Sequence, residues 1–276
     1  MHNTIQALPH RSPYILALVV SLIAIEFLWH RWRGSDGYDL KESAASLGIA
    51  IGRQFTRLAS AALLAPIFLW VYDRRLFTIA ISGLAGGLAV FLVTEFFYYW
   101  FHRFSHTVRW MWASHSVHHS STRLNLSAAY RVGWTDLISG DWLFFLVPIW
   151  FGFDPLAVFA VLGANLTYQI FLHTEAVPSL GPFEWVFNTP AHHRVHHAKN
   201  ARCLDKNFGG VLIVYDRLFG TFAKAPQDEP LQYGLVAKPA SLNPLRIAFG
   251  EWLAIARDMQ AATSPKHLWQ AAFGRP

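Results

Sequence analysis

Residues 76–106 read LFTIAISGLAGGLAVFLVTEFFYYWFHRFSH, an apolar run that passes directly into two histidines. A membrane-spanning helix needs about 20 apolar residues, so residues 76–100 predict one. If the helix continues, His102 and His106 lie four residues apart on the same face, at its end. The whole chain fits this setting, since it is 53% hydrophobic and only 14% charged, against roughly a quarter charged in soluble domains.

Four further apolar segments lie before and after this run, at residues 13–29, 58–72, 137–151 and 156–172. The first ends in HRWR without a small-residue cleavage site, so we expect a retained anchor. The last two are short for a full crossing, and the sequence GFDP between them indicates an antiparallel helical hairpin. We therefore predict an all-α, multi-pass membrane helical bundle. Residues 1–245 form its membrane-embedded domain, and residues 246–276 form a C-terminal amphipathic helix and tail.

The distribution of charge indicates orientation and excludes some partners. Basic residues follow the apolar segments 13–29 and 76–100. We therefore expect the C-terminal ends of these two segments, and the histidines, to lie on the cytoplasmic face. Arg74 and Arg75, on the opposite side, are the exception. The formal charge is +6, but no basic helix or RNA-binding signature occurs, so we expect no nucleic-acid partner. The single cysteine, Cys203, excludes an intrachain disulfide and a CxxC motif.

Histidines are concentrated in one part of the chain. Ten of the 14 lie between residues 102 and 197, where an even spread would place about five. Eight of them form the motifs HRFSH, HSVHH and HRVHH: His102, His106, His115, His118, His119, His193, His196 and His197. On a helix, HxxHH directs three imidazoles at one site. A ninth, His173, follows the last apolar segment, whereas His2, His10, His30 and His267 lie outside the cluster and are interpreted as incidental.

The chemistry of these side chains points to two metal ions. Imidazole suits iron, copper, nickel and zinc, and the shortage of carboxylates disfavours magnesium and calcium. Eight ligands exceed what one ion binds, so they imply two ions with room for an exogenous ligand. A non-redox metal-dependent hydrolase is an alternative, although no HExxH motif is present. A membrane metal-binding or transport protein is another, but it would place its ligands at mid-depth in several spans.

The segments YYWFHRFSH, MWASHSVHHSS, TPAHHRVHH, NFGG and YDRLFGT resemble the fatty acid hydroxylase and sterol desaturase superfamily of integral membrane di-iron enzymes. NLTYQIFLHTE with TPAHHRVHH is most similar to the alkylglycerol monooxygenase branch. The resemblance implies that the eight motif histidines and His173 bind two iron ions, which use O2 to hydroxylate or desaturate a lipid. It also implies an external electron donor, either a separate electron-transfer protein or a reduced pterin. The oligomeric state and the particular lipid stay open.

Some positions depart from the family pattern or lie near the ligands. Some members have a second histidine where this chain has Gln169, so the site has nine protein ligands or uses Gln169 through water. Glu95 lies two turns before His102, and we expect it to accept a hydrogen bond from a ligand imidazole or to pair with Arg103. Further candidates for such support are Glu175 and His192.

Overall fold

The computed structural model describes residues 13–236 and 240–276, and every regular element within these ranges is helical. His2 and His10 lie outside the described residues. In chain order the α-helices are α1 Pro13–Trp32, α2 Leu40–Asp73, α3 Gly83–Thr107, α4 Arg109–His115, α5 Asp136–Ser139, α6 Leu143–Phe151, α7 Pro155–Ile170, α8 Pro190–His197, α9 Val214–Leu218, α10 Pro244–Gln260 and α11 Pro265–Phe273. Short 3-10 helices are η2 His118–Ser120, η3 Ala128–Tyr130 and η4 Gly181–Trp185. The predicted all-α class is confirmed.

Two helices in the described ranges, α2 and α3, are long and apolar enough to cross a membrane. Helix α2 includes the predicted segment 58–72 but begins at Leu40, where the Asp39 carboxylate accepts hydrogen bonds from the N–H groups of Lys41 and Glu42. The predicted segments 137–151 and 156–172 form shorter helices, α6 with nine residues and α7 with 16. The two apolar helices indicate a membrane protein, and the multi-pass topology remains a prediction.

Helix α3 starts at Gly83, later than the predicted residue 76. The preceding segment packs against the turn between α6 and α7, where the N–H groups of Leu76 and Ile79 donate to the carbonyls of Trp150 and Gly152. Gly152 has φ +120°, and a Cβ there would lie 2.2 Å from the Phe77 oxygen. The turn therefore needs glycine, and it uses backbone groups that a longer α3 would have kept within the helix.

The main apolar core forms where α2, α3, α6 and α7 pack together. Phe68 of α2, Val90 of α3, Ile149 of α6 and Val158 of α7 are all buried in it. Tyr98, four residues before His102 on α3, belongs to the same core. Packing of these four helices therefore sets the position of the first histidines.

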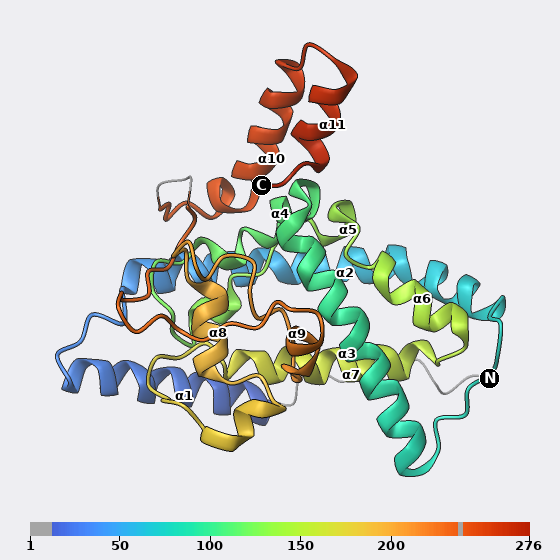
Figure 1. Cartoon of the computed structure of the whole chain (residues 1–276), viewed down its shortest axis with the longest axis horizontal. Helices are drawn as coiled ribbons and strands as arrows, with labels where there is room; N and C mark the ends of the chain where they lie inside the picture. The colour runs from blue at the N-terminus through green and yellow to red at the C-terminus, as the bar shows by residue number, and fades with distance from the viewer. Residues whose placement is uncertain (1–12, 237–239) are drawn as a thin grey trace.

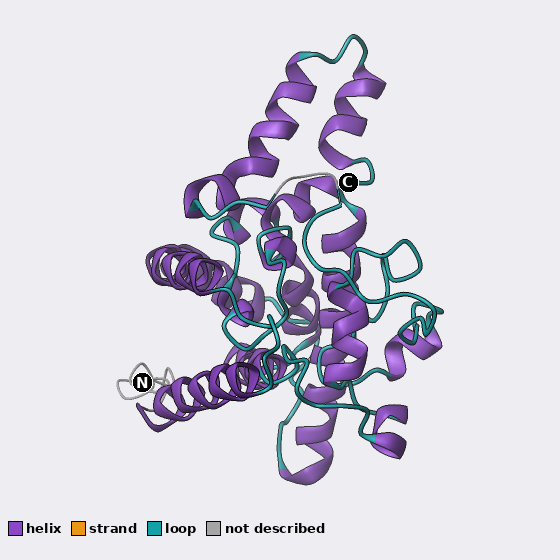
Figure 2. Cartoon of the chain, turned by 90° about the vertical axis from the view of Figure 1, so that its left-hand side faces the viewer, coloured by secondary structure: helices purple, strands orange, loops and turns teal. Residues whose placement is uncertain are grey.

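Helix α4 follows the C-terminal end of α3, and α10 and α11 pack on α4 (Figure 1). Helix α10 buries Ile247, Ala248 and Ile255 and packs on α4 and α2. With α11 it forms a hairpin that projects from the rest of the chain in both views (Figure 2).

Candidate metal centre

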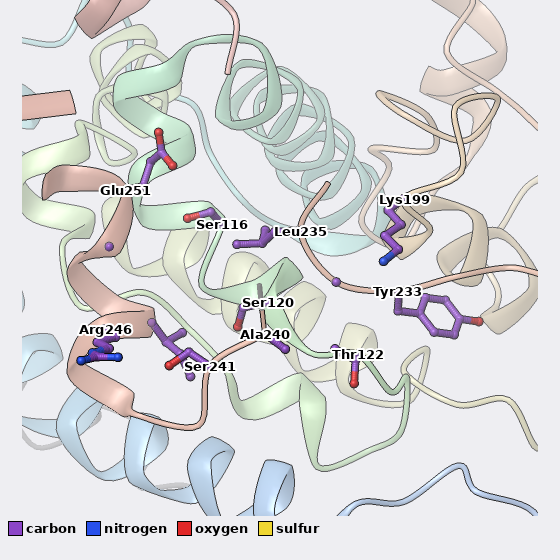
Figure 3. A pocket seen from close by; sticks show the side chains of 13 residues that line it. Ser116, Ser120, Thr122, Lys199, Tyr233, Leu235, Ala240, Ser241, Arg246 and Glu251 are labelled. Carbon is purple, nitrogen blue, oxygen red and sulfur yellow. The ribbon is translucent and has the colours of Figure 1, made fainter. Parts of the chain in front are cut away.

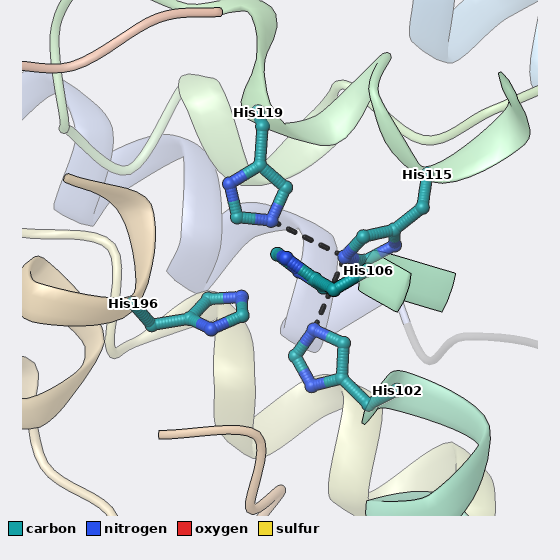
Figure 4. A group of neighbouring side chains, drawn as sticks. All are labelled: His102, His106, His115, His119 and His196. Carbon is teal, nitrogen blue, oxygen red and sulfur yellow. Dashed lines mark hydrogen bonds between the residues drawn. The ribbon is translucent and has the colours of Figure 1, made fainter. Parts of the chain in front are cut away.

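Nine histidines from four parts of the chain come together in two groups. The five-histidine group contains His102, His106, His115, His119 and His196, and the four-histidine group contains His118, His173, His193 and His197. In each group, one ring nitrogen of every residue lies within 4.8 Å of the others. Figure 4 shows the rings of the five-histidine group converging from α3, α4, η2 and α8. Every motif histidine and His173 is thus in one of the two groups.

Helical spacing decides which group each histidine joins. His102 and His106 are four apart on α3 and share the five-histidine group, as predicted. Each HxxHH motif, however, contributes to both groups, which corrects the expectation that its three imidazoles meet at one site. In residues 193–197, His193 and His197 share one group while His196 joins the other. Residues four apart differ by about 40° around a helix and residues three apart by about 60° in the opposite sense, so one motif spans two adjacent sites.

The motif at residues 115–119 reaches the same result without a continuous helix. Helix α4 ends at His115, and the 3-10 helix η2 begins at His118. His115 and His119 join the five-histidine group, and His118 joins the four-histidine group. The motif at 115–119 thus gives two histidines to the five-histidine group and one to the four-histidine group, and the motif at 193–197 does the reverse. Because each motif contributes to both groups, the two groups lie side by side. The rings of His119 and His197, from different groups, stack with centroids 4.4 Å apart.

Backbone carbonyls orient several of the rings through Nδ1. The Nδ1 atoms of His102, His118 and His173 lie 2.8, 3.2 and 2.7 Å from the carbonyl oxygens of Phe208, Arg131 and Gln169. A carbonyl oxygen only accepts, so each Nδ1 carries the proton and each Nε2 keeps its lone pair. These acceptors fix both the tautomer and the direction of the ring.

His196 receives the same kind of support from an unusual loop. Its Nδ1 lies 2.9 Å from the carbonyl oxygen of Lys206. The residues on either side, Asp205 and Asn207, both have a left-handed backbone, with φ 56° and 57°. Asp and Asn tolerate this conformation better than most residues. The Asn207 side chain donates to the carbonyls of His192 and Ala223, which holds the loop in place.

The Nε2 atoms of His118 and His173 carry the clearest evidence for a cation. They lie 3.1 Å apart. In each ring the proton is on Nδ1, so both Nε2 atoms are lone-pair acceptors and no hydrogen can lie between them. Two nitrogens bound to one ion at about 2.0 to 2.1 Å are separated by about 2.8 to 3.4 Å for angles from 90° to tetrahedral. The buried Nε2 atoms of His106 and His196 likewise have no hydrogen-bond partner in the described ranges. Both groups therefore fit a metal ion.

Burial keeps these imidazoles neutral. It lowers the pKa of His118 to about 4 and that of His196 to about 3. The pKa values of His115, His119, His173, His193 and His197 are also well below the ordinary range, because of burial first and neighbouring imidazoles second. At neutral pH each ring offers a nitrogen lone pair, which is the form that binds metals.

Gln169 lies next to the site, and its side-chain amide pairs with residues outside the two histidine groups. Its side-chain oxygen accepts a hydrogen bond from Tyr98 Oη at 3.0 Å, and its Nε2 donates to Asn165. Asn165 in turn donates to Glu95. Only the backbone carbonyl of Gln169 supports a ligand, His173. Gln169, the position that differs from the family pattern, is thus part of a buried hydrogen-bond network with Tyr98, Asn165 and Glu95.

The other predicted supporting residues bind elsewhere. Glu95 accepts from the N–H groups of Val211 and Leu212 at 2.8 and 3.0 Å, in addition to Asn165, so these hydrogen bonds join it to neither a ligand imidazole nor Arg103. Glu175 accepts from Tyr233 Oη. His192 lies outside both groups, and its ring packs on Phe222. The carbonyl groups that do orient the rings could not be identified from residue types.

A pocket of about 260 Å³ lies beside the second and third histidine motifs. Ser116, Ser120 and Thr122 line it together with Arg246 of α10 and Lys199, which follows His197 by two residues (Figure 3). Hydroxyl and charged groups make up much of this lining. Leu235, Ala240 and Ile247 also line it, so the pocket is mixed in polarity.

The fold and the site define an all-helical chain with two long apolar helices and a buried pair of histidine groups suited to two metal ions. Residues 87–221 match the fatty acid hydroxylase family model, and the chain belongs to this family. It is 36% identical to human alkylglycerol monooxygenase over 86% of this chain and 52% of that protein. It is 41% identical to the Danio rerio alkylglycerol monooxygenase over 81% and 49%.

A more distant relative, the ornithine lipid hydroxylase OlsE of Rhizobium tropici, is 27% identical over 82% of this chain and 69% of that protein. The chain spans about half the length of the alkylglycerol monooxygenases it matches. No solved structure matches it significantly.

Proposed function

We propose that the chain is a membrane di-iron oxygenase that binds one iron ion in each histidine group. The observation that carries this proposal is the pair of facing lone pairs on His118 and His173. The proposed ligands are His102, His106, His115, His119 and His196 for one ion and His118, His173, His193 and His197 for the other. An octahedral ion takes six ligands. Five histidines would therefore leave such an ion one position for another ligand, and four would leave two.

The proposed reaction inserts one oxygen atom of O2 into a C–H bond of a lipid. The second oxygen atom leaves as water, with two electrons and two protons supplied by an external donor. Two iron ions supply the redox chemistry that no side chain can perform. The protein's part is to hold the imidazoles neutral and in fixed orientation, through burial and through the carbonyls of Phe208, Arg131, Gln169 and Lys206.

The substrate class rests on the relatives. Those with the higher identities are named alkylglycerol monooxygenases, and the more distant one is named a lipid hydroxylase. We propose an alkylglycerol as substrate, hydroxylated at a C–H bond. The electron donor is a separate redox protein or a reduced pterin.

The proposed topology places the histidines at the cytoplasmic face. Helices α2 and α3 cross the membrane, and α1 and the α6–α7 hairpin complete a multi-pass bundle. His102 and His106 lie at the C-terminal end of α3, on the side that the distribution of basic residues assigns to the cytoplasm. A lipid in the bilayer would then approach the metal ions from the apolar part of the bundle.

The test is anaerobic purification, metal analysis, and O2-dependent turnover of an alkylglycerol beside a monoacylglycerol of equal chain length. We expect two iron ions per chain and a hydroxylated product that requires O2 and reductant. His196→Ala should lose metal and turnover, whereas His267→Ala, at an exposed position outside both groups, should retain both. Product formation without O2 would refute the oxygenase, and equal turnover of the two lipids would refute the substrate assignment.

A further inference from the structure

A buried ion pair lies behind the second histidine motif. The Arg131 side chain is 0% exposed, and its Nη2 lies 3.3 Å from Glu42 Oε2 in the first turn of α2. Its Nε donates to Ser46 Oγ at 2.9 Å and its Nη1 to Ser120 Oγ at 3.2 Å. A guanidinium without access to water must find its charge partner inside the protein, and Glu42 is that partner.

Glu42 also holds the chain immediately after the second motif. Its carboxylate accepts from Ser121 Oγ at 2.7 Å and from the Thr122 N–H at 3.1 Å. It further accepts from Thr122 Oγ1 at 2.5 Å. These residues follow His119 by only two and three positions, so one carboxylate ties the end of the motif to α2.

The same carboxylate reaches a histidine from the other side. The Arg131 guanidinium is held by Glu42, and the Arg131 carbonyl oxygen lies 3.2 Å from His118 Nδ1. His118 is thus fixed through the chain that follows its motif and through the acceptor that sets its tautomer. The Glu42 carboxylate contributes to both supports.

We propose that Glu42 is a positioning residue for the four-histidine group, directing His118 Nε2 toward the second metal ion. This inference deepens the proposed function, since it presumes that the group binds a metal. Carboxylates in such supporting positions ordinarily touch a ligand imidazole. Here the carboxylate acts one step further away, through Arg131 and the Ser121–Thr122 segment.

A second ion pair provides a matched control. Arg53 of α2 and Asp136 form two hydrogen bonds, at 3.1 and 2.8 Å, and so tie α2 to the chain five residues beyond Arg131. Within the described part of the chain, their side chains hydrogen-bond to Thr56 and Ser60 as well as to each other, and to no histidine or carbonyl that orients one. Asp136→Asn therefore breaks an ion pair of α2 without touching the support of His118.

The experiment measures Zn²⁺ per chain and Zn²⁺ affinity, by chelator competition, in the full chain in lipid nanodiscs. It compares the parent, Glu42→Gln, Asp136→Asn and the double variant Glu42→Gln with Arg131→Met. The double variant leaves no unpaired buried charge, and the backbone carbonyl at position 131 is retained. It supplies the comparison if Glu42→Gln alone does not fold.

We expect the double variant to unfold near the parent temperature yet to bind one of its two Zn²⁺ ions 10- to 100-fold more weakly, the range typical when a residue that orients a metal ligand is removed. Asp136→Asn should keep both ions at parent affinity. Parent affinity for both ions in the double variant would overturn the proposal, because Glu42 would then only neutralise Arg131. A parent chain that binds fewer than two ions would instead refute the proposed function, before any variant is compared.

Discussion

Replacing His173 by alanine removes one imidazole from the four-histidine group and leaves the five-histidine group intact. His173 is 2% exposed, and its Nε2 lies 3.1 Å from the Nε2 atoms of both His118 and His193. Within residues 13–236 and 240–276, no further histidine belongs to either group. The variant therefore tests the ninth proposed ligand, the one that belongs to no motif.

The expected loss follows from the number of ligands. Structural zinc sites with four ligands bind with about 10 to 16 kcal/mol, or about 2.5 to 4 kcal/mol per ligand if shared equally. At about 1.4 kcal/mol per factor of ten, losing one of four ligands weakens binding by roughly 100- to 1,000-fold. The ion in the five-histidine group should be unaffected to first order.

The assay loads anaerobically purified protein with Zn²⁺ and measures metal per chain against rising chelator. We expect His173→Ala to lose one ion at chelator concentrations where the parent retains two, while His267→Ala behaves as the parent. Retention of two ions at parent affinity would refute the assignment of His173. Loss of both ions together would refute the division into two separate groups.

Three further outcomes follow from the site. Gln169→Leu should destabilise the fold by about 1 to 3 kcal/mol in thermal unfolding, because it leaves buried polar partners unsatisfied, yet metal content should stay at two; loss of an ion would show Gln169 to be a ligand. Gly210→Ala would place a Cβ 2.0 Å from Asn165 Nδ2, so we expect about 1 to 3 kcal/mol lower stability, and an unchanged unfolding temperature would contradict the packing. In the folded chain the pKa values of His118 and His196 are lowered to about 4 and 3, below the ordinary value of about 6.5 that they regain on unfolding. The unfolded chain therefore binds protons first, and the metal-free fold loses stability as the pH falls from about 6.5 toward 3. Unfolding temperatures that do not decrease between pH 7.5 and 4 would contradict the burial of these two histidines.

Much of the site could be predicted because the ligands are chemically distinctive and regularly spaced. The motifs identified eight of the nine grouped histidines, and the end of the last apolar segment identified His173. The assignment of His118 and His196 to opposite groups required the geometry. The spacing of a motif shows that its three imidazoles lie on one side of a helix. It does not show that the middle histidine joins a different group from the other two.

The supporting contacts were harder to predict for a physical reason. The rings of His102, His118 and His196 are oriented by backbone carbonyls, and every residue has one, so residue type carries no signal. Glu95 was expected near an imidazole, yet it accepts from backbone N–H groups of a loop more than 100 residues away. Only tertiary packing brings these segments together.

The membrane helices show the same limit. Apolar length correctly indicated α2 and α3. Residues 76–82 are also apolar but form no helix, because their N–H groups pair with the α6–α7 turn. Hydropathy records burial in an apolar setting and does not distinguish a helix from a packed extended segment.

The central claim is that nine histidines hold two iron ions that activate O2. The most direct measurement is the iron content of anaerobically purified protein in nanodiscs, followed by one turnover of an alkylglycerol with ¹⁸O2 and a chemical reductant. We expect two iron ions per chain and one ¹⁸O atom in the hydroxylated lipid. One iron ion per chain, or a product whose oxygen comes from water, would contradict it.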